Sequence, residues 1–258
     1  MYILFLRSEC CLIYNLMILQ GDCFELIKNI DSKSIDLVLI DPPYLISRDS
    51  NFTKYSDNAS KEIVTKYGSI SIDFGEWDKS ELNWDFLFKE YNRILKDGGT
   101  LIIFYDIWKS NDIKYFADKY KFKQPRVCQW QKTNPVPINS KVNYLSNAIE
   151  YFFTFVKGKK PKFNSFYDNG VYKYPICHGK ERYEHPTQKP LQLILDIINK
   201  HSNKGDVVLD NFAGTFTVAH ACDNLDRRWI CIEKDEKYFN IGLRRINENR
   251  EKLGISKI

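Results

Sequence analysis

Four consecutive residues, Asp41-Pro42-Pro43-Tyr44, combine a carboxylate, two rigid backbone positions and an aromatic ring directly after an apolar run. This set suits methylation of an exocyclic amino nitrogen of a base, whose lone pair is delocalised into the ring and reacts poorly. Asp41 and the main-chain carbonyl of Pro42 can accept the two N–H hydrogens and free that lone pair, and proline orients the carbonyl in advance. The ring of Tyr44 can stack on a base rotated out of a duplex. The pattern predicts Asp41, Pro42 and Tyr44 as catalytic residues.

The same four residues also suit a plain turn that ends a strand, because proline and aspartate are common in turns. A match of four residues does not decide between the two interpretations. Their position after a strand and the presence of a second motif favour the catalytic one.

The second motif lies near the end of the chain, in Val207-Val-Leu-Asp-Asn-Phe-Ala-Gly-Thr-Phe-Thr217. It is typical of a strand, a glycine turn and a helix start, which let the backbone approach a ligand and point helix N–H groups at a carboxylate. Further along, Trp229-Ile-Cys-Ile-Glu233 ends a strand with an acid, where a ribose diol is typically held. Each piece alone favours an ordinary strand end, whereas both together predict a nucleoside site.

These residues need a scaffold that brings them together. Apolar runs predict strands at 17–20, 36–41, 100–105, 127–130, 149–156, 207–209 and 229–233. Apolar periodicity predicts helices at 23–30, 86–95 (closed by Asp97-Gly98-Gly99), 113–120, 191–201 and 216–222. The alternation predicts a doubly wound α/β fold with a mostly parallel sheet, whose ligands bind at the carboxyl ends of the strands. The acids expected at those ends are Asp22, Asp41, Asp210 and Glu233.

Length and composition predict one catalytic domain over residues 1–258, with 43% hydrophobic residues to form its core. Residues 1–16 are interpreted as an extension, with a misassigned start left open. The polar, irregular sequence of residues 45–80 predicts a mobile loop. The net charge of +5 is compatible with a polyanionic partner without indicating one.

The cysteines, the N-terminus and the hydropathy pattern bear on location. The seven cysteines include no C-x-x-C pair, which favours a reduced, cytoplasmic compartment. The sequence shows neither a leader nor a segment that spans a membrane, and no metal site is expected.

In their order, the motifs resemble those of the DNA amino-methyltransferases, specifically the beta group, in which the catalytic motif precedes the cofactor motif. The similarity covers most of residues 17–245, including Gly21-Asp22, Trp130-x-Lys132-x-Asn134-Pro135-x-Pro137 and His185-Pro-Thr-Gln-Lys-Pro190. The resemblance implies a Rossmann-like methyltransferase fold, S-adenosylmethionine as cofactor and adenine-N6 methylation of double-stranded DNA. Cytosine-N4 methylation is the first rival, and Asp rather than Ser before Pro-Pro-Tyr favours adenine. A homodimer and a cognate restriction endonuclease are left open as partners.

The resemblance also implies roles for single residues and segments. Glu233 would accept hydrogen bonds from the ribose hydroxyls, and Asp22 would contact the edge of the adenine ring. Residues 158–184 would read the target sequence, and 45–80 would fold over base and cofactor. A lysine run suits phosphate contacts or a solvated loop: Lys157, Lys159, Lys160 and Lys162. The remaining cofactor contacts are Asp210, Phe212, Gly214 and Thr215 around the pocket, and Thr187, Gln188 and Lys189 at its methionine end.

One position departs from the family pattern, in which the turn usually reads Asp-Pro-Phe-x-Gly-Ser-Gly-Thr. Here Asn211 replaces the proline, Thr215 the serine and Phe216 the second glycine. A phenylalanine at this point either crowds the cofactor, which would leave a DNA-binding protein with impaired catalysis, or turns into the core between helix and sheet. The second alternative is favoured.

Overall fold

The structure, a computed structural model, describes residues 17–44, 82–135, 147–158, 160–183 and 187–258. The chain divides into one unit of Met1–Pro42 with Asn83–Ile258 and a second unit of Pro43–Leu82. Of the second unit, Pro43, Tyr44 and Leu82 are described. The predicted extension at 1–16 and the predicted loop at 45–80 lie outside the described residues.

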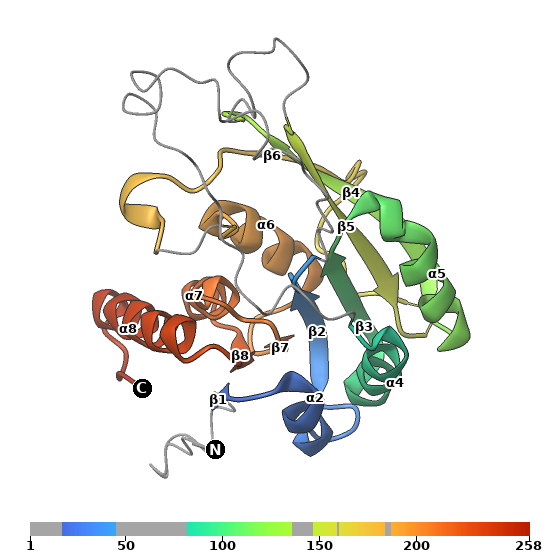
Figure 1. Ribbon diagram of the computed structural model, residues 1–258, viewed down its shortest axis with the longest axis horizontal. Coiled ribbons are helices and arrows are strands. Elements are labelled where there is room, and N and C mark those ends of the chain that lie inside the picture. Colours follow the sequence, from blue (N-terminus) through green and yellow to red (C-terminus); the bar gives the residue numbers. More distant parts are fainter. Residues whose placement is uncertain (1–16, 45–81, 136–146, 159, 184–186) are drawn as a thin grey trace, which may run out of the picture. The chain divides into compact units, whose positions relative to one another are not determined.

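In the described part of the first unit, a single eight-stranded sheet has the order β1-β8-β7-β2-β3-β5-β4-β6 (Figure 1). Strand β5 runs antiparallel to both of its neighbours, and the other adjacent strands are parallel. The predicted α/β class and mostly parallel sheet are confirmed. The strands are β1 (Met17–Gln20), β2 (Ile35–Ile40), β3 (Leu95–Phe104), β4 (Lys123–Lys132), β5 (Ile149–Val156), β6 (Val171–Tyr174), β7 (Val207–Asp210) and β8 (Arg228–Glu233).

Helices cover both faces of this sheet (Figure 1). One face carries α6 (Leu191–His201), α7 (Thr217–Asn224) and α8 (Glu236–Leu253); the other carries α2 (Cys23–Leu26), α4 (Trp84–Ile94) and α5 (Ser110–Lys119). Short 3₁₀ helices occur at Ile27–Asn29, Ile107–Lys109 and Gly179–Glu181. All six residues of β2 are buried, as expected for a strand with helices on both sides. Among the described residues, no helix is both long and apolar enough to cross a membrane.

The prediction placed the starts of β3 and β4 too late, and it missed one strand and one α-helix of the described residues. Asp97-Gly98-Gly99 does not close a helix; it lies inside β3, which begins directly after α4. Gly98 has a positive φ of 86°, and its N–H donates to the carbonyl of Lys157 at 2.6 Å, so a tertiary contact keeps this segment in the sheet. The short edge strand β6 and the amphipathic helix α8 were not predicted.

Two lysines of the predicted phosphate-binding run are used inside the fold. Lys157 Nζ donates to the carbonyls of Asn92 and Leu95. Lys162 Nζ bridges Asp36 and Asp206, each at 2.7 Å, at the edge where β2 and β7 begin. These contacts attach the segment after β5 to the amino edge of the sheet. Whether residues 158–184 read a target sequence stays a prediction.

Candidate active site

The predicted acids gather at one edge of the sheet. Strands β1, β8, β7 and β2 are parallel neighbours, so their carboxyl ends meet. Asp41 follows β2, Asp210 ends β7 and Glu233 ends β8. Gln20 pairs with Glu233, and Asp22 comes two residues later. The expectation that these acids share the carboxyl edge is confirmed.

The turn after β7 places a buried acid beside a glycine. Asp210 is 5% exposed and accepts the N–H of Phe212 at 3.1 Å. Burial raises the pKa of Asp210, and the nearby charges of Asp41 and Glu233 raise it further. Asn211, in the place of the family's proline, accepts a hydrogen bond from the hydroxyl of Tyr91 at 3.0 Å.

Glu233 is oriented by two backbone N–H groups. Its Oε2 accepts from Gly214 at 2.6 Å, and its Oε1 accepts from Asp235 at 2.7 Å. Gly214 has a positive φ of 50°, which a glycine adopts without strain. Burial raises the pKa of Glu233 to about 7, although the two N–H groups favour the ionised form.

The catalytic candidate Asp41 belongs to a line of alternating charges. Lys189 Nζ contacts Asp41 Oδ2 and lies 3.2 Å from Glu150 Oε2. Glu150 Oε1 lies 2.9 Å from Lys132 Nζ. The ammonium of Lys189 also lies over the ring of Phe104, 5.2 Å from its centroid.

The two central charges of this line favour each other's ionised form. Burial opposes the charge of Lys189, but Asp41 and Glu150 raise the pKa of its ammonium above the usual range. Burial also opposes ionisation of Glu150, but Lys189 and Lys132 lower its pKa overall. Sequence reasoning missed Glu150, because a glutamate at the start of an antiparallel strand has no local signal that connects it to Asp41.

Phe216 is packed in the core. It is fully buried, and its ring meets that of Phe239 edge-on at 5.8 Å between centroids. A Cβ added at Gly242 of α8 would lie 2.6 Å from the Phe216 ring, so the glycine makes the space that the ring occupies. The backbone of Phe216 keeps the left-handed conformation, with φ of 61° and ψ of 40°. The structure therefore agrees with the favoured alternative, in which the ring turns into the core.

Two predicted cofactor residues, Thr215 and Gln188, belong to a polar network that links the turn after β7 to α8 and to the segment before α6. Thr215 is buried, and its hydroxyl lies 3.3 Å from Gln188 Oε1. Gln188 Oε1 also accepts the N–H of Tyr183 at 3.0 Å. Arg245 of α8 donates to the carbonyl of Thr215 at 3.0 Å and to the hydroxyl of Thr217 at 2.8 Å. The side chains of Thr215 and Gln188 thus join the turn to α8 and to the segment before α6.

Arg245 was not predicted. It is 1% exposed, and its guanidinium lies 4.8 Å from the centroid of the Tyr183 ring. Its signal in the sequence is an arginine four residues after the apolar Ile241, which is a helical spacing.

Comparison with known proteins identifies the family. A family model described as DNA methylase (N6_N4_Mtase) matches residues 35–244, which is most of the chain. The chain belongs to this DNA methylase family. It is 32% identical to the Type II methyltransferase M.HinfI from Haemophilus influenzae, over 90% of this chain and 68% of that protein. It is 30% identical to the Type II methyltransferase M2.MboI from Moraxella bovis, over 91% of this chain and 88% of that one.

The fold agrees with solved structures of DNA methyltransferases. The M1.HpyAVI-SAM complex has a TM-score of 0.67 and 27% identity, over 90% of this chain and 99% of that one. The PvuII DNA methyltransferase (cytosine-N4-specific) has a TM-score of 0.66 over 93% of this chain and 92% of that one; at 16% identity it supports the fold alone. The chain is an S-adenosylmethionine-dependent DNA methyltransferase, and DNA is its macromolecular partner. The order of Asp41 before Asp210 agrees with the beta group.

The carboxyl edge of this DNA methyltransferase fits a nucleoside cofactor. Glu233 presents a carboxylate oriented by two backbone N–H groups, and it lies beside a glycine turn followed by a helix start. Asp210 and Phe212 belong to the same turn. These residues would hold S-adenosylmethionine, which carries a ribose with two hydroxyls and an adenine ring.

All the predicted cofactor contacts of the DNA methyltransferase stay predictions, those of Asp210, Phe212 and Glu233 included. Asp22 caps α2 by accepting the N–H of Phe24 at 2.9 Å, and it pairs with Lys234 at 3.0 Å. Thr187 is exposed. Lys189 was predicted to lie at the methionine end of the cofactor. Its ammonium contacts Asp41 and Glu150, which that prediction did not name.

We expect S-adenosylmethionine binding by the DNA methyltransferase to weaken as the pH falls below about 7. The ribose hydroxyls need the ionised carboxylate of Glu233, whose pKa burial raises to about 7. Above this pKa the affinity should be constant, and below it the affinity should fall by up to about tenfold per pH unit. Isothermal titration calorimetry across this range measures the effect.

Glu233→Gln is the matched control for this pH dependence. The amide presents one acceptor oxygen and sets an NH₂ group against Gly214 or Asp235, so binding should be weak and independent of pH. A parent protein whose affinity does not change with pH would argue against the ribose role.

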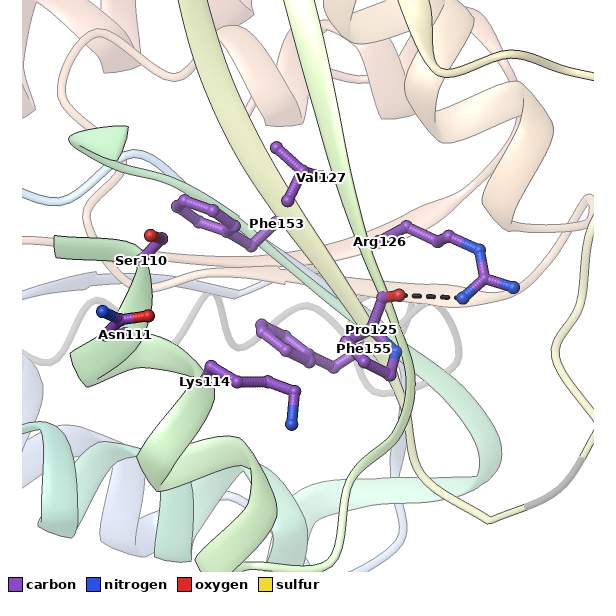
Figure 2. Close-up of a pocket in the computed structure, with 8 residues that line it drawn as sticks. All are labelled: Ser110, Asn111, Lys114, Pro125, Arg126, Val127, Phe153 and Phe155. Carbon is purple, nitrogen blue, oxygen red and sulfur yellow. Dashed lines mark hydrogen bonds between the residues drawn. The ribbon is translucent and has the colours of Figure 1, made fainter. Parts of the chain in front are cut away.

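A pocket lies elsewhere on the DNA methyltransferase, between α5 and the strands β4 and β5 (Figure 2). Its lining contains no carboxylate, so it does not include the acidic edge. The residues that line it are Ser110, Asn111, Lys114, Pro125, Arg126, Val127, Phe153 and Phe155.

Proposed function

We propose that this DNA methyltransferase transfers a methyl group to the N6 amino group of an adenine flipped out of duplex DNA. The observation that carries the proposal is the position of Asp41 and Pro42 after β2, at the edge shared with Asp210 and Glu233. This arrangement brings an acceptor for amino hydrogens next to the residues that suit the cofactor.

The residues of this chain have two tasks in the reaction: they accept hydrogen bonds from the amino group, and they take up one proton. S-adenosylmethionine, when bound, supplies a methyl group on a positively charged sulfur. Asp41 and the Pro42 carbonyl accept the two N–H hydrogens, which returns the lone pair to the nitrogen as it bonds to the methyl carbon and the carbon–sulfur bond breaks. The methylated nitrogen then releases one proton, which the carboxylate of Asp41 can take.

Cytosine-N4 methylation is the competing assignment, because the same acceptors serve both amino groups. The family model includes both classes by name. Asp rather than Ser before Pro-Pro-Tyr favours adenine. Mass analysis of nucleosides from DNA methylated by the protein tests the proposal: N6-methyladenine supports it, and N4-methylcytosine overturns it.

The packing of Phe216 bears on a third assignment, a DNA-binding relative with impaired catalysis. That assignment was motivated by a ring that crowds the cofactor, and the ring lies instead against Phe239 and Gly242. We therefore favour an active enzyme. A homodimer, a cognate restriction endonuclease and a cytoplasmic location remain proposals, and the mass of the protein in solution tests the first.

We expect Tyr44→Phe to retain most of the methylation activity and Tyr44→Ala to lose capture of the flipped base. Stacking uses the ring, and base–aromatic stacking contributes about 1–3 kcal/mol per base. Fluorescence of 2-aminopurine at the target position, measured with each variant, reports the flipped base. Equal loss in both variants would assign the role to the hydroxyl instead.

A further inference from the structure

The carboxyl edge of the sheet gathers negative charge where the proposed reaction needs an ionised acceptor. Asp41 and Glu233 both raise the pKa of the buried Asp210, so the acids at this edge act on one another. Like charges at close range favour protonation of one of the group. A protonated Asp41 would carry a donor on one oxygen and would be a weaker acceptor through the other, so it would activate an amino group less.

Lys189 supplies the opposite charge at this edge. Its side chain is 7% exposed, and its ammonium contacts Asp41 Oδ2 from the segment before α6. Glu150 of β5 holds the same ammonium at 3.2 Å, and Lys132 of β4 holds Glu150 at 2.9 Å. The four groups come from four segments of the chain and alternate in sign, from Lys132 through Glu150 and Lys189 to Asp41.

We propose that Lys189 is a positioning residue that keeps Asp41 ionised and oriented toward the amino group, while Glu150 shares the same ammonium and Lys132 partly offsets the charge of Glu150. The inference rests on the proposed function, in which Asp41 is the acceptor. An ionised carboxylate has about four lone-pair sites, so a contact with one cation is compatible with acceptance of an amino hydrogen. This role differs from a contact of Lys189 with the methionine end of the cofactor.

A second lysine of the same chain provides a matched control. Lys162 also bridges two carboxylates, Asp36 and Asp206, but at the amino edge of the sheet. Loss of its charge should therefore lower stability without changing the chemistry at the carboxyl edge.

The experiment measures the single-turnover methylation rate against pH, with saturating S-adenosylmethionine and duplex DNA, for Lys189→Gln and Lys162→Gln. Lys189→Gln should lower the rate at neutral pH by on the order of tenfold or more. Its acid limb should move to higher pH by about one unit or more, because Asp41 loses the cation that favours its ionised form. Lys162→Gln should melt at a lower temperature and keep the parental pH profile.

Glu150→Gln is expected to shift the acid limb of the pH–rate profile in the direction opposite to that of Lys189→Gln. Without Glu150, the charge of Lys189 is shared with one carboxylate fewer and acts more strongly on Asp41, so the acid limb should move to lower pH or stay at the parental value. If Lys189→Gln does not fold, Glu150→Gln still tests the inference. An acid limb that moves to higher pH in Glu150→Gln would overturn it.

Cofactor affinity, measured by calorimetry, separates the two roles of Lys189. The inference is overturned if Lys189→Gln keeps the parental pH profile, whether or not it binds S-adenosylmethionine more weakly. Asp41→Ala, measured in parallel, tests the proposed function by itself, because it removes the acceptor. An active Asp41→Ala variant overturns the proposed function, whereas an inactive one together with a parental Lys189→Gln overturns the inference alone.

Discussion

Replacement of Asp41 with alanine is expected to reduce methyl transfer by on the order of a hundredfold or more, because it removes a preorganised acceptor from the reacting amino group. Asp41 contributes little to the core, since its side chain is 28% exposed, so the variant should fold. The measurement is the single-turnover rate with saturating DNA and cofactor. Calorimetry with S-adenosylmethionine should give nearly the parental affinity.

The other end of the same strand provides the control for Asp41. Asp36 is 2% exposed, and its carboxylate accepts from Lys96, Lys162 and the N–H of Val207. Asp36→Asn should therefore lower the melting temperature more than Asp41→Ala does, while its rate per folded molecule stays near the parental value. Near-normal turnover in Asp41→Ala would refute the assignment of Asp41 as the acceptor.

The second large effect is expected at Phe216, in the folding free energy. Loss of the buried ring should by itself destabilise the protein by roughly 3–5 kcal/mol, as large-to-small core substitutions do. Glycine also relieves the left-handed backbone strain at this position, which offsets roughly 1–2 kcal/mol, so the net loss expected for Phe216→Gly is about 1–4 kcal/mol. Urea unfolding measures the free energy, and the affinity for S-adenosylmethionine should not increase.

Gly242 is the partner in a double-mutant cycle with Phe216. Gly242→Ala alone should destabilise by about 1–3 kcal/mol, because the new Cβ meets the near side of the Phe216 ring, which cannot move away freely. In the Phe216→Gly background the same substitution should be neutral or stabilising, since alanine favours a helix by about 1 kcal/mol over glycine. Additive effects in the cycle, or a Phe216→Gly variant of parental stability that binds cofactor more tightly, would show that the ring does not pack as described.

Local patterns were sufficient for the elements that carry the site. The apolar run before Asp41 predicted β2, and the alternation of strands and helices predicted a sheet whose carboxyl edge holds Asp22, Asp41, Asp210 and Glu233. The physical reason is that a strand buried on both faces must be apolar throughout, so its ends are visible in the sequence. The motif order was sufficient for the family.

The tertiary structure alone decided what those residues contact. Glu150 lies in none of the sequence motifs, and only the antiparallel insertion of β5 beside β3 brings it to the carboxyl edge, where it meets Lys189. The direction of the Phe216 ring depended on Gly242 in α8, which α7 and β8 separate from Phe216 in the chain. The sequence shows which residues can lie at the carboxyl edge of the sheet, because each strand end is visible in the local pattern. It does not determine which side chains meet there, because charge pairing and packing depend on neighbours that are distant in the chain.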